Sequence, residues 1–198
     1  MRRALLAVLV FAGCGPLASL PIALSTIPPT DLPAAGRLVD VRIVDDRVGD
    51  SAGWIGLEQG GDISRDMVLE GGGSLASRLI SDVVASLRAR GYRAEAREGP
   101  ARSDATALDI RIVRFALTVQ ARGFKQPAWH ASWAFLGRAS VANTASPVWT
   151  ELVLTIREEH VSTWSLGSYR QTMDGYYRQA LAELVDRFAA AVAVEEAR

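Results

Sequence analysis

The chain is poor in cysteine, in lysine and in net charge. It has 198 residues, of which one is cysteine and one is lysine, Lys125, and its 22 basic side chains balance 22 acidic ones. One cysteine can form neither an internal disulfide nor a cysteine-rich zinc site. A neutral balance offers no basic surface to a phosphate backbone, which excludes a general nucleic-acid binder. With 49% hydrophobic and 22% charged residues, the composition is typical of one globular domain and not of a disordered chain.

Groups that carry catalysis are equally scarce. His130 and His160 are the only histidines, and no Gly-x-Ser-x-Gly segment occurs. Glu158 and His160 would share one face of an extended strand, which is a conceivable pair of metal ligands, but no third ligand is spaced to join them. We therefore expect no metal site, no catalytic residues and no enzymatic activity.

A glycine run precedes the first predicted helix. Gly71, Gly72, Gly73 and Ser74 resemble a turn that cradles phosphate, because free backbone N–H groups gather at a helix start. A nucleotide-binding P-loop needs a lysine after its last glycine, and Lys125 lies elsewhere. The run is better interpreted as a hinge followed by a helix N-cap, and we expect no cofactor.

The first 13 residues have the pattern of a secretory signal peptide. Arg2 and Arg3 precede an apolar run over residues 4–11, and the small pair Ala12-Gly13 leads to Cys14. The run is too short to span a bilayer, which takes roughly 20 residues. Residues 11–14 resemble the bacterial lipobox, in which the cysteine becomes the lipidated first residue of the mature protein. An ordinary signal peptide with an accidental cysteine is the alternative.

Cleavage before Cys14 would remove Arg2 and Arg3 and leave 20 basic against 22 acidic side chains. Attraction to anionic lipids is then not the means of attachment, so palmitate-like acyl chains on Cys14 must hold the protein. Gly15 stands where an aspartate would resemble the inner-membrane retention signal. The sequence therefore predicts a lipoprotein of the cell outer membrane that faces the periplasm.

Proline distinguishes the segment that follows. Residues 14–36 hold five of the eight prolines, which indicates an extended tether with a maximal reach of about 60 to 70 Å. Residues 37–198 are then expected to form a single folded domain.

Period-two and helical patterns alternate in that domain. Apolar and polar residues alternate over 38–44, which predicts a half-buried strand with Asp40 on its polar face. Residues 45–73 lack this pattern and are predicted to form a long loop with a short strand around 54–57. Ser74 can cap a helix through Leu87 that stops at Gly91, and residues 92–97 alternate again.

The second half is dominated by strands. Apolar residues over 108–119 change parity near Val113, which predicts either a β-bulge or a strand buried on both faces. Residues 129–141 and 148–156 predict a hairpin, and a final helix is predicted over 174–194. The order predicts an α+β fold: a mainly antiparallel sheet of four to five strands with two amphipathic helices on one face.

Several short segments resemble the YajG-like family of bacterial envelope lipoproteins. Its members combine a lipobox and tether with a V-x-D-x-R segment, an Ile-Gly pair and a helix ending in a Gly-aromatic pair, although Asp and Arg are adjacent here. The matching residues are Val44, Asp46, Arg47, Ile55, Gly56, Gly91 and Tyr92. The resemblance implies an envelope lipoprotein with no catalytic residues to transfer. Similar arrangements occur in the lipopolysaccharide-assembly lipoprotein LptE and in auxiliary lipoproteins of lipid-transport systems.

Tryptophan is the residue type that suggests a binding surface. Trp133, with Phe135, is expected to fill the core beneath the helices, whereas the other four could line an apolar surface for a partner or a lipid: Trp54, Trp129, Trp149 and Trp164. We expect Asp46 and Arg47 to have a structural role, either as surface charges or as a pair fixing the next loop. The sequence thus favours a non-catalytic accessory or assembly factor that binds an envelope protein. A module that handles lipid or lipopolysaccharide is the alternative, and the oligomeric state stays open.

Overall fold

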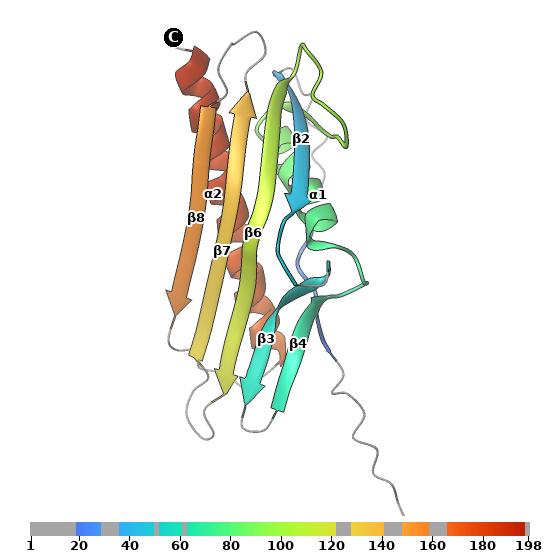
Figure 1. Cartoon of the computed structure of the whole chain (residues 1–198), viewed down its shortest axis with the longest axis vertical. Coiled ribbons are helices and arrows are strands. Elements are labelled where there is room, and N and C mark those ends of the chain that lie inside the picture. The colour runs from blue at the N-terminus through green and yellow to red at the C-terminus, as the bar shows by residue number, and fades with distance from the viewer. Residues whose placement is uncertain are drawn as a thin grey trace, which may run out of the picture.

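One long strand organises the sheet. The computed structural model describes residues 19–28, 36–49, 52–60, 63–121, 128–140, 148–158 and 166–196. β6 (Thr106–Ala121) pairs antiparallel with β7 (Ala128–Ser140), and β7 pairs antiparallel with β8 (Val148–Glu158). These strands form the tall left side of the sheet in Figure 1.

Two shorter strands share the other edge of β6. β2 (Leu38–Asp45) pairs parallel with the first half of β6, and β3 (Trp54–Gly60) pairs parallel with the second half. The chain therefore runs along one edge of β6 twice in the same direction, with a break at residues 46–53 (Figure 1).

Three more strands extend this side. β5 (Arg93–Ala96) adds to β2 in parallel, and β4 (Ile63–Leu69) adds to β3 in antiparallel orientation. β1 (Leu20–Ile22) pairs parallel with β4 at the outer edge.

Two helices lie behind the sheet in Figure 1. α1 (Leu75–Ala89) begins at Ser74, whose side chain accepts a hydrogen bond from the Ser77 amide, and Gly91 follows it with φ of 88°. Both ends agree with the sequence prediction. α2 (Leu166–Glu196) starts earlier than the predicted residue 174. Its 31 residues give a length of about 46 Å.

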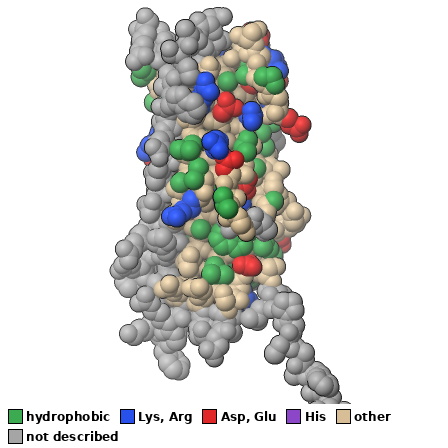
Figure 2. Space-filling model, viewed as in Figure 1, with side chains coloured by type: hydrophobic (Ala, Val, Ile, Leu, Met, Phe, Trp, Pro, Cys, Tyr) green, Lys and Arg blue, Asp and Glu red, His purple; other side chains and the backbone are tan. Residues whose placement is uncertain are grey.

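The core fills the space between sheet and helices. Phe115 stacks on Trp133 with ring centroids 5.2 Å apart, and Phe135 lies beside them. Trp133 and Phe135 are both 1% exposed, which confirms the prediction that they fill the core. The opposite face of the sheet carries intermixed basic, acidic and apolar side chains (Figure 2).

The predicted fold class is wrong. Within the described residues the sheet has eight strands and is mixed, with four parallel pairings, in place of a mainly antiparallel sheet of four to five strands. The difference arises because β2 and β3 both lie beside β6 and run parallel to it. In addition, α1 returns the chain to the far side of β2, so that β5 also pairs with β2 in parallel. A sequence pattern reports which residues of a strand are buried and not which strand lies beside it.

Two strands lie where no regular strand was expected. β4 belongs to the predicted loop over 45–73, and β1 belongs to the segment expected as a tether over 14–36. The predicted bulge near Val113 is confirmed, because the β6–β7 register shifts between Ile112 and Arg114.

Candidate functional site

Residues 19–28, called the strap below, pack onto the folded body. Leu20, Ile22 and Leu24 are buried in the core, and the Ile22 carbonyl accepts a hydrogen bond from the Glu70 amide at 2.9 Å. Apolar residues thus alternate along the strap as in an edge strand with one buried face.

A buried carboxylate on α1 joins the strap to both helices. Asp82 is 1% exposed and accepts hydrogen bonds from Tyr177 Oη at 2.6 Å, Arg78 Nε at 2.7 Å and the Ile27 amide at 3.2 Å. Arg78 also donates to the Leu24 carbonyl at 2.8 Å. Burial, together with the hydrogen bond to Asp82, raises the pKa of Tyr177 far above its ordinary value, so the hydroxyl stays a donor.

A second carboxylate holds the strap on α2. Asp174 accepts from the Ser25 amide at 2.7 Å and from Ser25 Oγ at 2.9 Å, and Arg178 Nε donates to it at 2.9 Å. Burial pushes the pKa of Asp174 upward, but the bonds from Ser25 and Arg178 outweigh it and hold that pKa below its ordinary value. The carboxylate therefore stays charged and keeps the strap in place.

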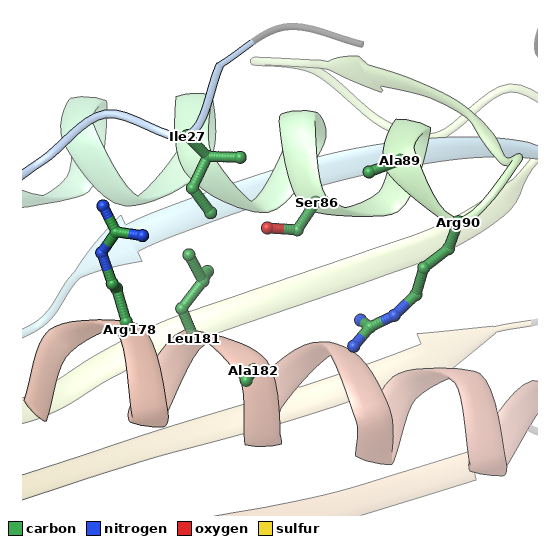
Figure 3. Close-up of a pocket in the computed structure, with 7 residues that line it drawn as sticks. All are labelled: Ile27, Ser86, Ala89, Arg90, Arg178, Leu181 and Ala182. Carbon is green, nitrogen blue, oxygen red and sulfur yellow. The ribbon is translucent and has the colours of Figure 1, made fainter. Parts of the chain in front are cut away.

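An open groove lies beside the strap, between α1 and α2. Its volume is about 300 Å³, and Ile27 and Leu181 point toward each other across its middle (Figure 3). Ala89 and Ala182 add apolar lining, and Ser86 adds a hydroxyl.

Guanidinium groups stand at the two ends of this groove, Arg178 at one and Arg90 at the other (Figure 3). Arg90 pairs with the exposed carboxylate of Asp186 at 2.5 Å, and Arg178 pairs with Asp174. Apolar walls between two ion-paired arginines suit an amphiphile whose acidic head group can compete with the exposed Asp186 for Arg90.

A wider hollow of about 480 Å³ separates the strap from the glycine run before α1. Gly71 and Gly72 have φ of 85° and 73°, which lets the chain turn sharply from β4 into the helix. Ser74 Oγ is occupied by Ser77, so this turn caps α1, as the N-cap prediction requires.

Arg47 fills the break between β2 and β3. Its side chain is 2% exposed, forms a two-pronged bond to Asp45 at 2.8 and 2.7 Å, and donates to the Trp54 carbonyl at 2.7 Å and the Phe115 carbonyl at 3.4 Å. Burial raises the pKa of Asp45, but the bonds from Arg47 more than offset it, so the pKa lies below its usual value. The partner of Arg47 is therefore Asp45, whereas Asp46 pairs with Arg111.

The remaining YajG-like residues also have structural places. Ile55 is fully buried and Val44 is half-buried near the end of β2. A Cβ on Gly56 would lie 2.1 Å from the Leu117 carbonyl oxygen, so only glycine lets β3 approach β6 this closely. Gly91 ends α1, and the Tyr92 ring meets Phe188 edge-on at 5.9 Å.

Asp40 is a buried charge that sequence patterning assigned to the solvent face. It is 3% exposed because the segment after β5 covers it: Arg97 donates at 2.6 Å, and Arg102 donates at 2.5 Å from its guanidinium and 2.7 Å from its amide. Burial raises its pKa, but the bonds from Arg102 and Arg97 prevail and lower it. No sequence spacing links Asp40 to arginines 57 and 62 residues away.

Of the tryptophans proposed as a binding surface, Trp54, Trp129 and Trp149 lie at separate places on the sheet. Trp54 is half-buried and its indole donates to Asp66 at 3.0 Å. In the β7–β8 hairpin, Trp129 lies opposite Glu158 and Trp149 opposite Arg138, which are at opposite ends. Trp164, Cys14 and His160 lie outside the described residues.

The described ranges contain no group of three His, Cys, Asp or Glu side chains that could hold a metal ion. Among the helices that the structure describes, none combines the length and the apolar character needed to span a bilayer.

Comparisons with known proteins relate the chain to others through its fold. No protein-family model and no curated protein matches the sequence. The fold is similar to that of protein XCC0632 from Xanthomonas campestris, assigned to the family model DUF330, with a TM-score of 0.57 and 14% identity over 91% of this chain and 100% of that one. It is also similar to a crystal structure described only as that of an uncharacterized protein, with a TM-score of 0.50 and 15% identity over 84% of this chain and 98% of that one. The chain thus has the fold of a bacterial DUF330 protein.

Proposed function

We propose that this chain is a lipoprotein of the bacterial envelope, anchored through Cys14, which serves as a non-catalytic accessory or assembly factor for another envelope protein. The carrying observation is the place of the single cysteine, at the end of a signal-like apolar run and six residues before β1. Cleavage before Cys14 leaves every described residue of the strap intact. The proposal includes the finer expectations of a YajG-like lipoprotein at the periplasmic face of the outer membrane.

The edge of β8 is the surface that fits a protein partner. β8 has 11 residues and pairs with β7 on one side, and no other described strand pairs with it. An open strand edge presents backbone donors and acceptors to which a partner's strand can add.

Membrane fractionation tests the anchor. The full chain and its Cys14→Ser variant would be expressed with the signal intact, and the mass of the N-terminal peptide would report acylation. We expect the native chain in the outer-membrane fraction and the variant in the soluble periplasmic fraction, because removal of the acyl chains removes the means of attachment. A variant that still fractionates with the outer membrane contradicts the proposal.

Crosslinking in intact cells tests the partner. A photoreactive residue would replace Thr150 or Glu151 on β8, and Arg42 on β2 would be the matched control inside the sheet. We expect one partner to be captured from both β8 positions and not from Arg42. Equal capture from all three positions would rule out recognition through the strand edge.

A lipid-handling module is the second candidate, and the groove between α1 and α2 favours it. Its apolar walls and its arginines at both ends suit an acidic amphiphile. Extraction of lipid from purified Cys14→Ser protein, followed by mass spectrometry, would report a bound phospholipid or lipopolysaccharide.

Two tryptophan variants, one inside the groove and one outside it, test whether the lipid binds there. Ala182 is exposed and lines the groove, so Ala182→Trp fills it, whereas Ala190→Trp places the same ring on an exposed part of α2 outside it. Loss of the lipid from the first variant alone supports this candidate, and retention in both excludes the groove as the site.

A further inference from the structure

The strap leaves very little chain between the lipid anchor and the folded body. Five residues, 15–19, separate Cys14 from Leu20, which is buried and paired with β4. Six Cα steps extend to at most about 22 Å. The long stand-off expected from a tether over 14–36 is therefore not available, because residues 20–27 belong to the body.

Residues 15–19 are called the leash below. The direction of β1 determines at which end of the body the leash joins it. β1 is parallel to β4, with Leu20 opposite Met67 and Ile22 opposite Leu69. The chain before Leu20 thus enters from the side where β4 begins, at Ile63. Four Cα steps along β4 lead from Met67 back to Ile63, which is about 14 Å. A fully extended leash that follows β4 would project only about 8 Å beyond that end.

Several elements meet at this end of the molecule. Gly60, at the end of β3, lies opposite both Ile63 and Ala121, and β7 starts beside the end of β6. Figure 1 places the arrowhead of β3, the start of β4 and the arrowhead of β6 at the same lower end, with the end of α2 at the other. The 16 residues of β6 separate the two ends by about 50 Å.

We infer that the β3–β4 end of the body faces the head groups of the membrane that holds the lipid chains, while the C-terminal end of α2 points away from it. The inference rests on the proposed anchor at Cys14. The partner of this end is a phospholipid surface, and a protein that reaches the body from the far side would meet the opposite end.

The described charges on β3 and β4 determine how the membrane contact should depend on lipid charge and salt. The described ionisable side chains on β3 and β4 are Glu58 and Arg65, which pair with each other, and Asp66, which accepts from Trp54. The described side chains of β3 and β4 thus offer no surplus of positive charge for anionic lipids. The closeness of this end to the membrane comes from the leash and is expected in zwitterionic vesicles and at high salt alike.

Dye quenching at the two ends tests the orientation. Because Cys14 is the only cysteine and is consumed by acylation, Ser64→Cys or Ala193→Cys provides a single thiol for a dye, and both positions are exposed. The acylated full chain would be placed in phosphatidylcholine vesicles that carry a spin label on the head group. We expect the dye on residue 64 to be quenched several-fold more strongly than the dye on residue 193, with no dependence on salt.

A lengthened leash is the control. Insertion of about twenty Gly and Ser residues between Gly15 and Pro16 adds a flexible chain that lets the body tumble, so the contrast between the dyes should disappear. Equal quenching at both positions of the native-length chain would overturn the inference, because the body would then lie flat. If the N-terminal peptide carries no acyl chain, it is the proposed function that fails, and mass measurement separates the two failures.

Discussion

The Tyr177 hydroxyl of α2 donates a hydrogen bond of 2.6 Å to the Asp82 carboxylate of α1, at a point where both side chains are 1% exposed. The same carboxylate accepts from the strap at Ile27. One buried carboxylate thus links α1, α2 and the strap, which lie far apart in the sequence. Replacing Asp82 tests how strongly the strap depends on this link.

Asp82→Asn should destabilise the protein strongly. The substitution leaves Arg78 and Tyr177 without their charged acceptor, and breaking such a buried network costs about 3 to 5 kcal/mol. Urea unfolding would measure the loss, and limited proteolysis would report release of the strap. Asp186→Asn is the matched control, because its pair with Arg90 is exposed and should contribute at most about 1 kcal/mol. Similar losses in both variants would contradict a special role for Asp82.

Gly56→Ala should disrupt the junction of β3 and β6. A Cβ there would lie 2.1 Å from the Leu117 carbonyl oxygen, so the two strands must separate. Gly175→Ala is the control on α2, where nothing lies within 4 Å and alanine should stabilise the helix by about 0.5 to 1 kcal/mol. Thermal unfolding should therefore move in opposite directions for the two alanines, and a stabilising Gly56→Ala would refute the close approach.

Arg47→Lys should lower the stability of the protein, because Arg47 connects the chain at the break between β2 and β3. Lysine keeps the charge but cannot bond Asp45 with two prongs and reach the Trp54 carbonyl at the same time. We expect a loss of about 2 to 4 kcal/mol in urea unfolding. Arg111→Lys, whose side chain is 60% exposed, should change stability by less than about 1 kcal/mol. Equal tolerance of lysine at both sites would show that Arg47 acts only as a charge.

Acid should remove the stabilisation at Asp40. Its pKa is lower in the folded protein than the ordinary value of an aspartate, so the unfolded chain binds the proton more tightly. The contribution is complete above the unfolded pKa and is lost as the pH falls through the folded pKa. Asp40→Asn should thus be less stable than the native chain at pH 7, and the difference should shrink below about pH 4. A difference between the two urea midpoints that stays constant with pH would argue against a lowered pKa.

Local features of this fold could be predicted because their causes are local. Ser74 and Gly91 mark the two ends of α1 through backbone geometry within a few residues. The parity change near Val113 reports a bulge because side chains alternate strictly along a strand. The apolar stripe of α2 identifies its buried face, since Tyr177, Leu181 and Phe188 are all buried.

Pairings between distant segments could not be predicted in this way. Proline marks residues 14–36 as a tether, yet Pro21 is tolerated in β1, whose short strand lies at the edge of the sheet. The carboxylates that hold the strap, Asp82 and Asp174, look like ordinary helix residues until α1 and α2 come together. The groove exists only where these two helices and Ile27 meet, so no single segment of the sequence signals it.

The bond between Ser25 and Asp174 spans 149 residues, and this sets an order of assembly. In a chain that leaves its synthesis or export machinery N-terminus first, Ser25 emerges long before α2 exists. The long loop between them must close before either residue gains from the contact. The bonds from the strap to β4 and α1 need only the first 82 residues, so the contact between the strap and Asp174 on α2 forms after them.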